Sequence, residues 1–299
     1  MLKPRAYLID SSIYIFRAWH TYDERMTDSL GQPSNAVLGF SDFLYQLIQQ
    51  KQPRYLACAF DASQTRSYRR ELFPEYKANR LPAPAALKNQ FQHCRAFCRA
   101  VGLAEFGSDR YEADDIIGSL ATRLRAQGFA ITVVSADKDL AQLVCGEEDI
   151  WWDFARGTVL NPRGVEKQFG VRPEQIADML ALSGDKIDNI PGIPGIGYKT
   201  AAKLLQKYHC IEHLLENIDK IPQLKFRGAA RMQALLNAHR DLLPRNKKLT
   251  TIVTDMDLDD DQDLSWKGLD AEAFTRIAAQ LAISAAAQQR WHNLALYLD

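Results

Sequence analysis

The stretch AITVVSADKD, residues 130–139, places a short apolar run directly before two aspartates, Asp137 and Asp139. Such a run is typical of a strand that is buried on both faces of a parallel sheet. Two other segments repeat the pattern: AYLID (6–10) ends in Asp10, and YLACAFD (55–61) ends in Asp61. Because long helix-like segments separate these strands, the sequence predicts an α/β fold with a parallel sheet flanked by helices.

The second half of the chain has a different pattern. Beyond about residue 172 strand signals fade and helical periodicity takes over, as in PEQIADMLALSG (173–184) and KTAAKLLQKY (199–208). We therefore expect two domains: residues 1–172, which carry the sheet, and residues 173–299, which form a helical lobe.

Between those two helical segments lies SGDKIDNIPGIPGIGYKT, residues 183–200, in which Gly192, Gly195 and Gly197 fall within six positions. This spacing predicts a helix-hairpin-helix over about 175–207. Backbone N–H groups of such a loop can approach a phosphodiester chain closely, since glycine has no side chain. We expect Lys199 and Thr200, at the start of the next helix, to join this contact with DNA.

Acidic residues gather where the predicted strands end. Ligands of open parallel sheets bind beyond the carboxyl ends of the strands, so these acids should converge. One such aspartate is ordinarily the N-cap of the next helix, but nine carboxylates cannot share a site without cations. Oxygen ligands favour Mg²⁺ or Mn²⁺ over zinc, and two or more such ions support phosphodiester hydrolysis. The predicted metal-binding residues are the strand-end acids Asp10, Asp61, Asp137 and Asp139, together with Glu112, Asp114 and Asp115 at the start of an apolar helix and Asp185 and Asp188 before the glycine loop.

Charge and composition support a nucleic-acid partner and exclude a membrane span. The 37 basic and 37 acidic residues cancel, but residues 62–90 hold six bases against two acids, and 220–248 hold eight against one. Five cysteines, none in a CxxC pair, favour reduced thiols and a cytoplasmic location. No apolar run approaches the ~18 residues that a membrane helix needs.

Three competing motif interpretations fail on spacing. GIPGIGYKT has Tyr198 where a nucleotide-binding P-loop needs lysine. The acidic run 254–264 lacks the glycine and the final glutamate of a calcium loop. His209 and His213 lie four residues apart without the further ligands of a zinc site.

Five segments, LIDSS, FDASQTRSYRRELFPEYKANR, YEADDIIG, SADKDLAQLV and SGDKIDNIPGIPGIGYKTA, occur in the order and spacing of the structure-specific 5′-nucleases. The chain thus resembles the family that includes the N-terminal 5′-nuclease domain of bacterial DNA polymerase I, here as a stand-alone protein. The resemblance implies a PIN-like (resolvase-like) domain with a helical arch around 62–95, a helix-three-turn-helix that grips duplex DNA, and a bound K⁺ ion. It also implies that Arg69, Tyr76, Lys77 and Arg80 engage DNA, with Lys77, Arg80, Asp10 and Asp115 acting in catalysis.

The expected function is a metal-dependent 5′-3′ exonuclease and flap endonuclease acting on branched, nicked or 5′-ended DNA, including RNA primer ends. Coupling to a DNA polymerase would occur in trans. Two alternatives remain open at this point: a DNA-binding module whose catalytic centre has decayed, and a PIN-type ribonuclease.

Overall fold

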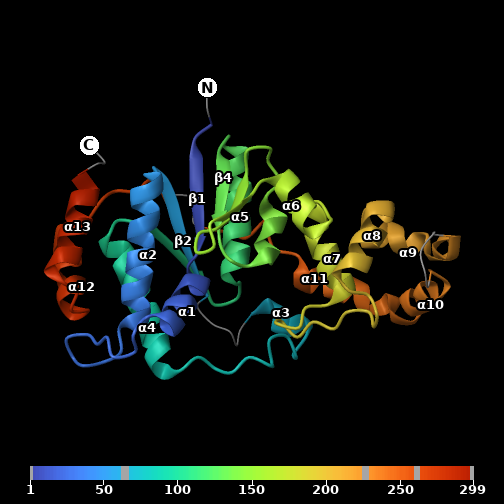
Figure 1. Ribbon diagram of the computed structural model, residues 1–299, viewed down its shortest axis with the longest axis horizontal. Helices are drawn as coiled ribbons and strands as arrows, with labels where there is room; N and C mark the ends of the chain where they lie inside the picture. Colours follow the sequence, from blue (N-terminus) through green and yellow to red (C-terminus); the bar gives the residue numbers. More distant parts are fainter. Residues whose placement is uncertain (1–2, 62–66, 224–228, 259–262, 297–299) are drawn as a thin grey trace.

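A computed structural model of the 299-residue chain describes residues 3–61, 67–223, 229–258 and 263–296. At its centre lies a six-stranded sheet of order β3-β2-β1-β4-β5-β6 (Figure 1). Neighbouring strands run parallel except β6, which is antiparallel to β5. The strands are β1 (Arg5–Asp10), β2 (Tyr55–Asp61), β3 (Ala104–Ser108), β4 (Ala130–Val134), β5 (Ile150–Asp153) and β6 (Thr158–Leu160).

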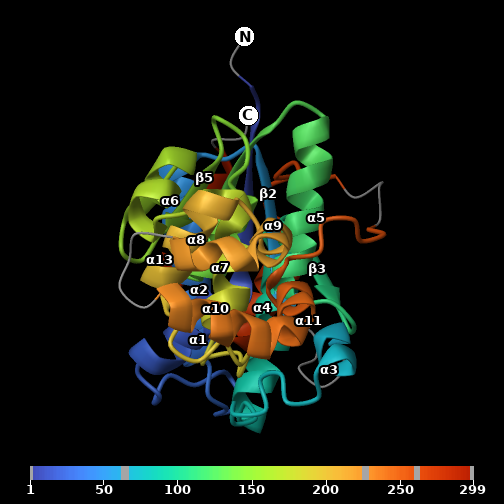
Figure 2. The same ribbon diagram turned by 90° about the vertical axis from the view of Figure 1, so that its right-hand side faces the viewer.

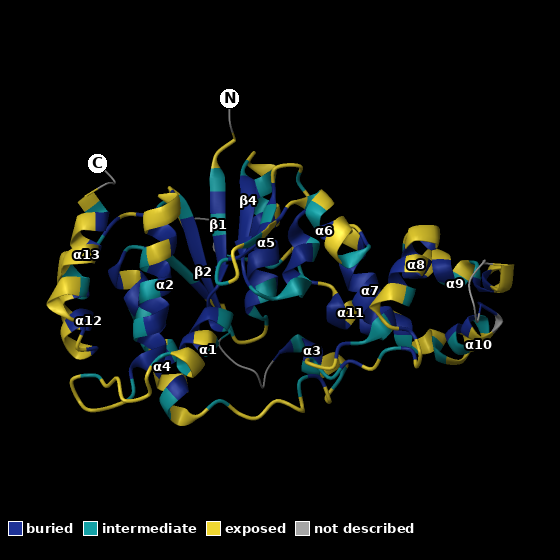
Figure 3. Cartoon of the chain, viewed as in Figure 1, coloured by how far each residue is buried: buried dark blue, intermediate teal, exposed yellow. Residues whose placement is uncertain are grey.

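Helices cover both faces of this sheet. Alternate residues of β1 point to opposite sides: Ala6 and Leu8 join one apolar cluster, whereas Ile9 joins the other. The first cluster includes residues of α5 (Ala113–Ala126), and the second includes residues of α1 (Ser11–Thr21), α2 (Asn35–Lys51) and α4 (Ala85–Ala100). The central strands are buried between these layers (Figure 3). This arrangement confirms the predicted α/β fold.

The helical lobe lies to one side of the sheet, on the right of Figure 1 and towards the viewer in Figure 2. The helix α6 (Pro162–Phe169) follows β6 and leads to the lobe, whose α-helices are α7 (Ile176–Ser183), α8 (Tyr198–Tyr208), α9 (Ile211–Glu216), α10 (Ala229–His239) and α11 (Leu243–Thr250). The 3-10 helices η2 (Pro173–Gln175), η3 (Ile218–Gln223) and η4 (Arg240–Leu242) connect them.

The predicted helix-hairpin-helix is formed by α7, the loop 184–197 and α8. The loop begins with a pair of backbone hydrogen bonds between Asp185 and Ile190, of 2.9 and 2.8 Å. Ile193 and Ile196 are buried, so they anchor the loop on the core; Gly195 lies between them, and Gly192 and Gly197 lie on either side. A Cβ atom on Gly192 would lie 2.2 Å from the carbonyl carbon of Ser183, which explains why this position needs glycine.

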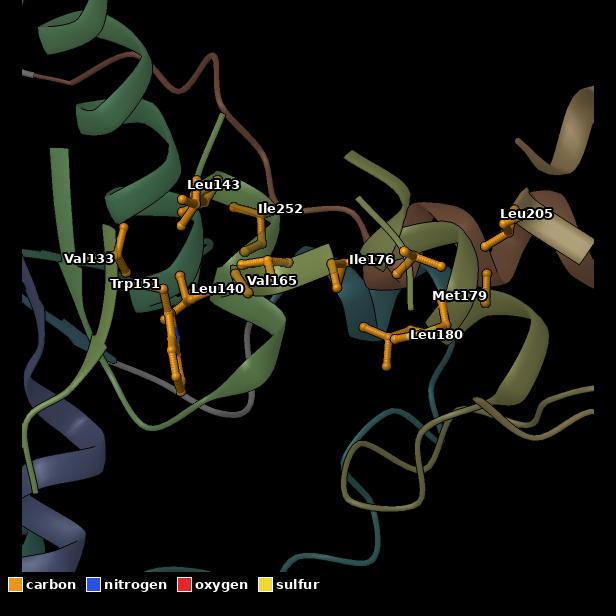
Figure 4. Packing of buried hydrophobic residues seen from close by; sticks show 14 of the residues in the cluster. Val133, Leu140, Leu143, Trp151, Val165, Ile176, Met179, Leu180, Leu205 and Ile252 are labelled. Carbon is orange, nitrogen blue, oxygen red and sulfur yellow. The ribbon is translucent and has the colours of Figure 1, made fainter. Parts of the chain in front are cut away.

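One apolar core joins the sheet to the helical lobe. The same buried cluster contains Val133 of β4, Leu140 of the 3-10 helix η1 (Lys138–Leu143), Ile176 and Met179 of α7, and Leu205 of α8 (Figure 4). Because buried side chains continue without interruption from one half to the other, the lobe is held in a defined place beside the carboxyl ends of the strands.

The last two helices return to the sheet domain. Two aromatic rings of α12 (Ala271–Gln280) and α13 (Ala285–Ala295) pack against Phe97 of α4: Phe274 is tilted to it with centroids 6.3 Å apart, and Trp291 meets it edge to face at 5.4 Å. Figure 1 shows both helices at the end of the molecule opposite α8. This placement departs from the expected extent of the helical lobe, 173–299, because the apolar faces of these helices bury against α4 rather than against α7 or α8.

The expected helical arch around 62–95 is only partly helical where it is described. Residues 62–66 lie outside the described part of the chain. Beyond them the segment contains the five-residue helix α3 (Tyr68–Leu72), turns over 74–79, an extended stretch and the first turns of α4.

Candidate functional site

Asp10 and Asp61 stand at the carboxyl ends of the neighbouring strands β1 and β2. Asp10 caps α1, accepting from the Ile13 N–H at 3.4 Å, and also accepts from the Ser135 hydroxyl at 2.8 Å. Asp61 accepts from the Ala113 N–H at 2.9 Å. Each carboxylate oxygen has two lone pairs, so capping leaves acceptor capacity for a further ligand.

Asp114 and Asp137 complete this group at the same edge. Asp137 caps η1 and accepts from the Asp139 N–H at 3.0 Å. The Asp114 carboxylate, in the first turn of α5, has no hydrogen-bond partner within the described part of the chain. We call Asp10, Asp61, Asp114 and Asp137 the sheet-edge acids: within the described residues, none lies within ion-pair distance of a lysine or arginine.

The sheet-edge acids repel one another. Burial, followed by the charge of Asp61, raises the pKa of the Asp10 carboxyl to about 7. Burial also raises the pKa of Asp114 well above its ordinary value, and the charges of Asp10 and Asp137 raise it further. Carboxylates with such raised pKa values are poised to bind a cation, which would relieve both effects.

A second group of acids is paired with basic side chains from other segments. The Lys77 ammonium lies 2.6 Å from Glu112 Oε2 and 3.8 Å from Asp188 Oδ2, and the Arg80 guanidinium lies 2.5 Å from Asp188 Oδ1. The Tyr76 hydroxyl donates to one of these two acids, with Oε2 of Glu112 at 3.1 Å and Oδ2 of Asp188 at 3.0 Å. Residues 76–80 therefore join the sheet domain to the helical lobe.

These contacts favour the charged forms of Glu112 and Lys77, whereas the pKa shifts of Asp10 and Asp114 favour their neutral forms. Burial alone would raise the pKa of Glu112, but Lys77 and Arg69 outweigh burial and lower it to about 2. Burial alone would lower the pKa of Lys77, but Glu112 and Asp188 outweigh burial and raise it above its ordinary value. Both groups are therefore charged at neutral pH.

Lys138 forms a similar bridge, which the sequence interpretation missed. Its ammonium lies 3.0 Å from Asp185 Oδ2 and 3.2 Å from Asp139 Oδ1. Burial alone would raise the pKa of Asp185, but Lys138 outweighs burial and lowers it below its ordinary value. The pKa of Asp139, in contrast, is raised to about 7 by burial and by the charge of Asp137. We call Glu112, Asp139, Asp185 and Asp188 the bridged acids. The position of Lys138 between two expected ligands, in SADKD, was the available signal.

The environment of Asp115 differs from that of the other eight acids. Its two oxygens lie 2.6 and 2.8 Å from two nitrogens of Arg69, and both side chains are buried. The carboxylate also accepts from the N–H groups of Val253 and Glu112, at 2.9 and 3.1 Å. Arg69 further donates to the Leu249 carbonyl at 2.9 Å. The pair thus binds α3, α5 and the end of α11 together.

The segment 75–80 is locked against the start of the hairpin loop. Asn189 Nδ2 donates to the Glu75 carbonyl at 2.7 Å, and the Lys77 N–H donates to the Asp188 carbonyl at 2.9 Å. Lys77 and Asn189 both have left-handed backbones, with φ of 54° and 57°. A left-handed lysine is uncommon, and such conformations concentrate where a side chain has to be held in one place.

The expected DNA-binding residues are in three different situations. Gly195 and Gly197 are exposed, and a Cβ atom on Gly197 would meet nothing within 4 Å. Lys199 is exposed and Thr200 partly buried in the first turn of α8. Gly192 instead packs against the backbone of α7, while Arg69 and Tyr76 are only 3% and 2% exposed.

No three His, Cys, Asp or Glu side chains within the described ranges converge closely enough to hold a metal ion as they stand. The residues nevertheless fit a hard divalent cation, because all donors are carboxylate oxygens and Asp114 has no hydrogen-bond or ion-pair partner among the residues that the structure describes. Mg²⁺ usually keeps several waters and binds through one or two carboxylates, so a tight ligand cluster is not required.

Among the helices of the described chain, none is both long and apolar enough to cross a bilayer.

A parallel sheet with an acidic edge, joined to a lobe that carries a glycine hairpin, defines the resolvase-like class of hydrolytic nucleases. Residues 5–170 match the 5′-3′ exonuclease, N-terminal resolvase-like domain, and residues 171–272 match the 5′-3′ exonuclease, C-terminal SAM fold. The chain belongs to the 5′-3′ exonuclease family.

Two relatives illustrate the range of this family. A 5′-3′ exonuclease of Aquifex aeolicus is 35% identical over 87% of this chain and 86% of its own length. A DNA polymerase I of Bacillus caldotenax is 36% identical over 94% of this chain, which spans only 32% of that polymerase.

Solved structures support the fold. A phage T5 5′-exonuclease with bound zinc ions has a TM-score of 0.64 at 21% identity, covering 98% of both chains. A phage T5 flap endonuclease in complex with DNA and metal ions has the same TM-score at 19% identity, again covering 98% of both chains. At such identities the likeness concerns the fold alone.

Proposed function

We propose that this chain is a divalent-metal-dependent 5′-3′ exonuclease and flap endonuclease acting on 5′ flaps and on nicked or branched duplex DNA. One observation carries the proposal: the four sheet-edge acids and the four bridged acids lie near one another at the carboxyl ends of the strands. Lys77 and Arg80 lie beside them. The phage T5 nucleases that share the fold were solved with metal ions, and one of them with DNA.

The metal-binding residues would be the eight acids of these two groups, and the ions two or more of Mg²⁺ or Mn²⁺. Divalent ions bound there supply a water of lowered pKa and positive charge for the reacting phosphate. Within this arrangement Asp10 and Asp137 fix the orientation of their carboxylates by capping α1 and η1, which keeps one face of each carboxylate directed to the site.

Lys77 and Arg80 would bind the scissile phosphate and stabilise the charge that develops on it. Both are held by Glu112 and Asp188 in the structure, so a phosphate would share or replace those acids as partner. Asp115 and Arg69 take a revised role in this proposal. Because each saturates the other in a buried pair, they position α3 and α5 rather than binding metal or DNA.

The loop 184–197 would hold the duplex backbone. Gly195, Gly197 and the first turn of α8 present an exposed backbone to which a phosphate can come close, with Lys199 and Thr200 beside it. We assign the expected K⁺ ion to this loop, whose backbone carbonyl groups would hold it. RNA primer ends as substrates, coupling to a polymerase in trans and a cytoplasmic location complete the proposal.

A gel assay on a labelled 5′ DNA flap, with Mg²⁺ or with EDTA, tests it directly. Cutting in Mg²⁺ and none in EDTA is expected. A protein that binds the flap yet never cuts it is a decayed module, and preferential cutting of an RNA hairpin identifies a ribonuclease. Full activity in EDTA would exclude the metal mechanism.

A further inference from the structure

Lys138 is paired with two acids that the proposed function gives to a metal ion. It starts η1 in the sheet domain, yet its ammonium reaches 3.0 Å from Asp185, in the loop after α7. The same nitrogen lies 3.2 Å from Asp139. Among the residues that the structure describes, it is the one cation within 4 Å of either carboxylate.

The side chain has a third neighbour on the DNA-facing side. The Lys138 ammonium lies 5.9 Å from the centre of the Tyr198 ring, and Tyr198 is 43% exposed. Tyr198 is the first residue of α8 and follows Gly197 directly. Lys138 therefore stands between the carboxylates and the surface on which a DNA backbone would rest, and its side chain is itself 30% exposed.

We propose that Lys138 is a positioning residue that competes with the metal: its ammonium holds Asp139 and Asp185 together, and a divalent ion must displace it to bind them. The proposal rests on the proposed function, since it takes these two acids as metal ligands. The ammonium and a divalent ion repel each other, so an ammonium that stays on these two carboxylates weakens the binding of a divalent ion there.

Once a divalent ion has displaced it, the Lys138 ammonium needs another negatively charged or aromatic partner. The Tyr198 ring offers a weak cation–π contact. A DNA phosphate beside Gly197 would offer a stronger, charge-assisted hydrogen bond. DNA binding should therefore favour release of the two acids. By thermodynamic reciprocity, the metal should then also strengthen DNA binding.

The experiment measures Ca²⁺ binding to the EDTA-treated 299-residue chain by calorimetry, without DNA and then with a short nicked duplex. The variants are Lys138→Met, which keeps the length and loses the charge, and Lys138→Arg, which keeps the charge. Lys186→Met is the matched control. Lys186 also neighbours Asp185 but is exposed and forms no ion pair with any residue of the described chain.

Without DNA, Lys138→Met should bind Ca²⁺ roughly tenfold more tightly than the parent, as removal of a competing charge implies. Lys138→Arg and Lys186→Met should remain near the parent. The nicked duplex should strengthen Ca²⁺ binding to the parent more than to Lys138→Met. A merely structural bridge predicts the opposite, because freeing Asp185 would weaken Ca²⁺ binding.

Unchanged or weaker Ca²⁺ binding by Lys138→Met would overturn the proposal. Thermal melting in EDTA, together with circular dichroism, shows whether the variant is folded. If it is not, Lys138→Gln replaces it, with the same tightening expected and the same result overturning the proposal. The flap assay separates the two proposals: a parent that cuts while Lys138→Met loses Ca²⁺ affinity refutes only the role of Lys138.

Discussion

The sheet-edge acids and the bridged acids lie side by side, yet their partners differ in kind. Asp10, Asp61 and Asp137 accept hydrogen bonds from backbone N–H groups and a serine hydroxyl, and Asp114 accepts none from the described residues. Glu112, Asp139, Asp185 and Asp188 each contact a lysine or arginine ammonium or guanidinium. The sheet-edge acids therefore need a cation from solution to balance their charge, whereas the bridged acids are paired with lysine or arginine side chains of the chain itself.

This difference separates two tasks that the sequence presents as one acidic set. The sheet-edge acids stand on regular backbone elements, at the ends of β1 and β2 and at the starts of α5 and η1, so they can keep their places despite repulsion. Bridged acids are held by side chains from residues 77–80 and from η1, so their positions depend on contacts that a substrate can exchange. Mutations in the two groups should therefore have different signatures.

The largest effect is expected from the sheet edge. Asp114→Asn removes one of the presumed metal ligands, and the loss of several kcal/mol of charge stabilisation should slow single-turnover cleavage of a 5′ flap about 10³-fold. DNA binding in Ca²⁺ should not weaken by a comparable factor, because a negative charge is lost. Normal cutting by Asp114→Asn would break the distinction between the groups.

A smaller effect is expected from the bridging cations. Lys77→Ala should slow single-turnover cleavage roughly 10²-fold, as removal of a comparable electrostatic donor does. Saturating DNA should not restore the rate, because the charge acts on the developing negative charge of the phosphate. Full recovery at saturating DNA would make Lys77 a binding residue only. Lys167→Ala, on the exposed side of α6 and outside both basic stretches, is the control.

The glycine loop should show an effect on binding rather than on chemistry. Gly197→Leu adds a side chain where the structure has open space, so folding should be retained while the backbone of DNA is kept away. Binding to all duplex sequences should weaken roughly tenfold, as loss of a charged hydrogen bond implies.

Gly192→Ala provides the contrasting control for the loop. Its Cβ atom would collide with the Ser183 backbone at 2.2 Å, so this variant should lose stability, measured as a lower melting temperature. If Gly197→Leu binds DNA as the parent does, the loop is not the binding surface.

Sequence patterns could predict the acidic edge because it depends on local features. Buried strands such as β4 have a recognisable apolar run, and a parallel sheet brings their ends to one edge. The strands β3, β5 and β6 were missed because they have only three to five residues and mix apolar with polar side chains. The partly helical character of 67–84 was also beyond reach, since long-range contacts to Asp188 and Asn189 determine it.

Which acid meets which cation could not be predicted, because it depends on side-chain reach between distant segments. Arg69 and Asp115 are 46 residues apart, and their mutual saturation removes both from the exposed surface. Lys138 is adjacent to Asp139, but its contact with Asp185 arises only because the apolar core fixes α7 beside η1. The return of α12 and α13 to α4 likewise follows from tertiary packing of amphipathic helices.

The smallest effect provides the sharpest comparison, because its sign should reverse between the groups. In EDTA, Asp114→Asn removes mutual repulsion among carboxylates that are partly or fully buried, and should stabilise the fold by about 1 kcal/mol. Asp188→Asn leaves Arg80 without its acid and Lys77 with Glu112 alone, so it should destabilise the fold by about 1 kcal/mol, given the partial exposure of Arg80. Denaturant unfolding of both variants and the parent at neutral pH measures the difference. Because both substitutions replace aspartate by asparagine and remove one negative charge, net charge cannot explain opposite signs. A shift of the same sign in both variants would mean that the two groups form one electrostatic unit.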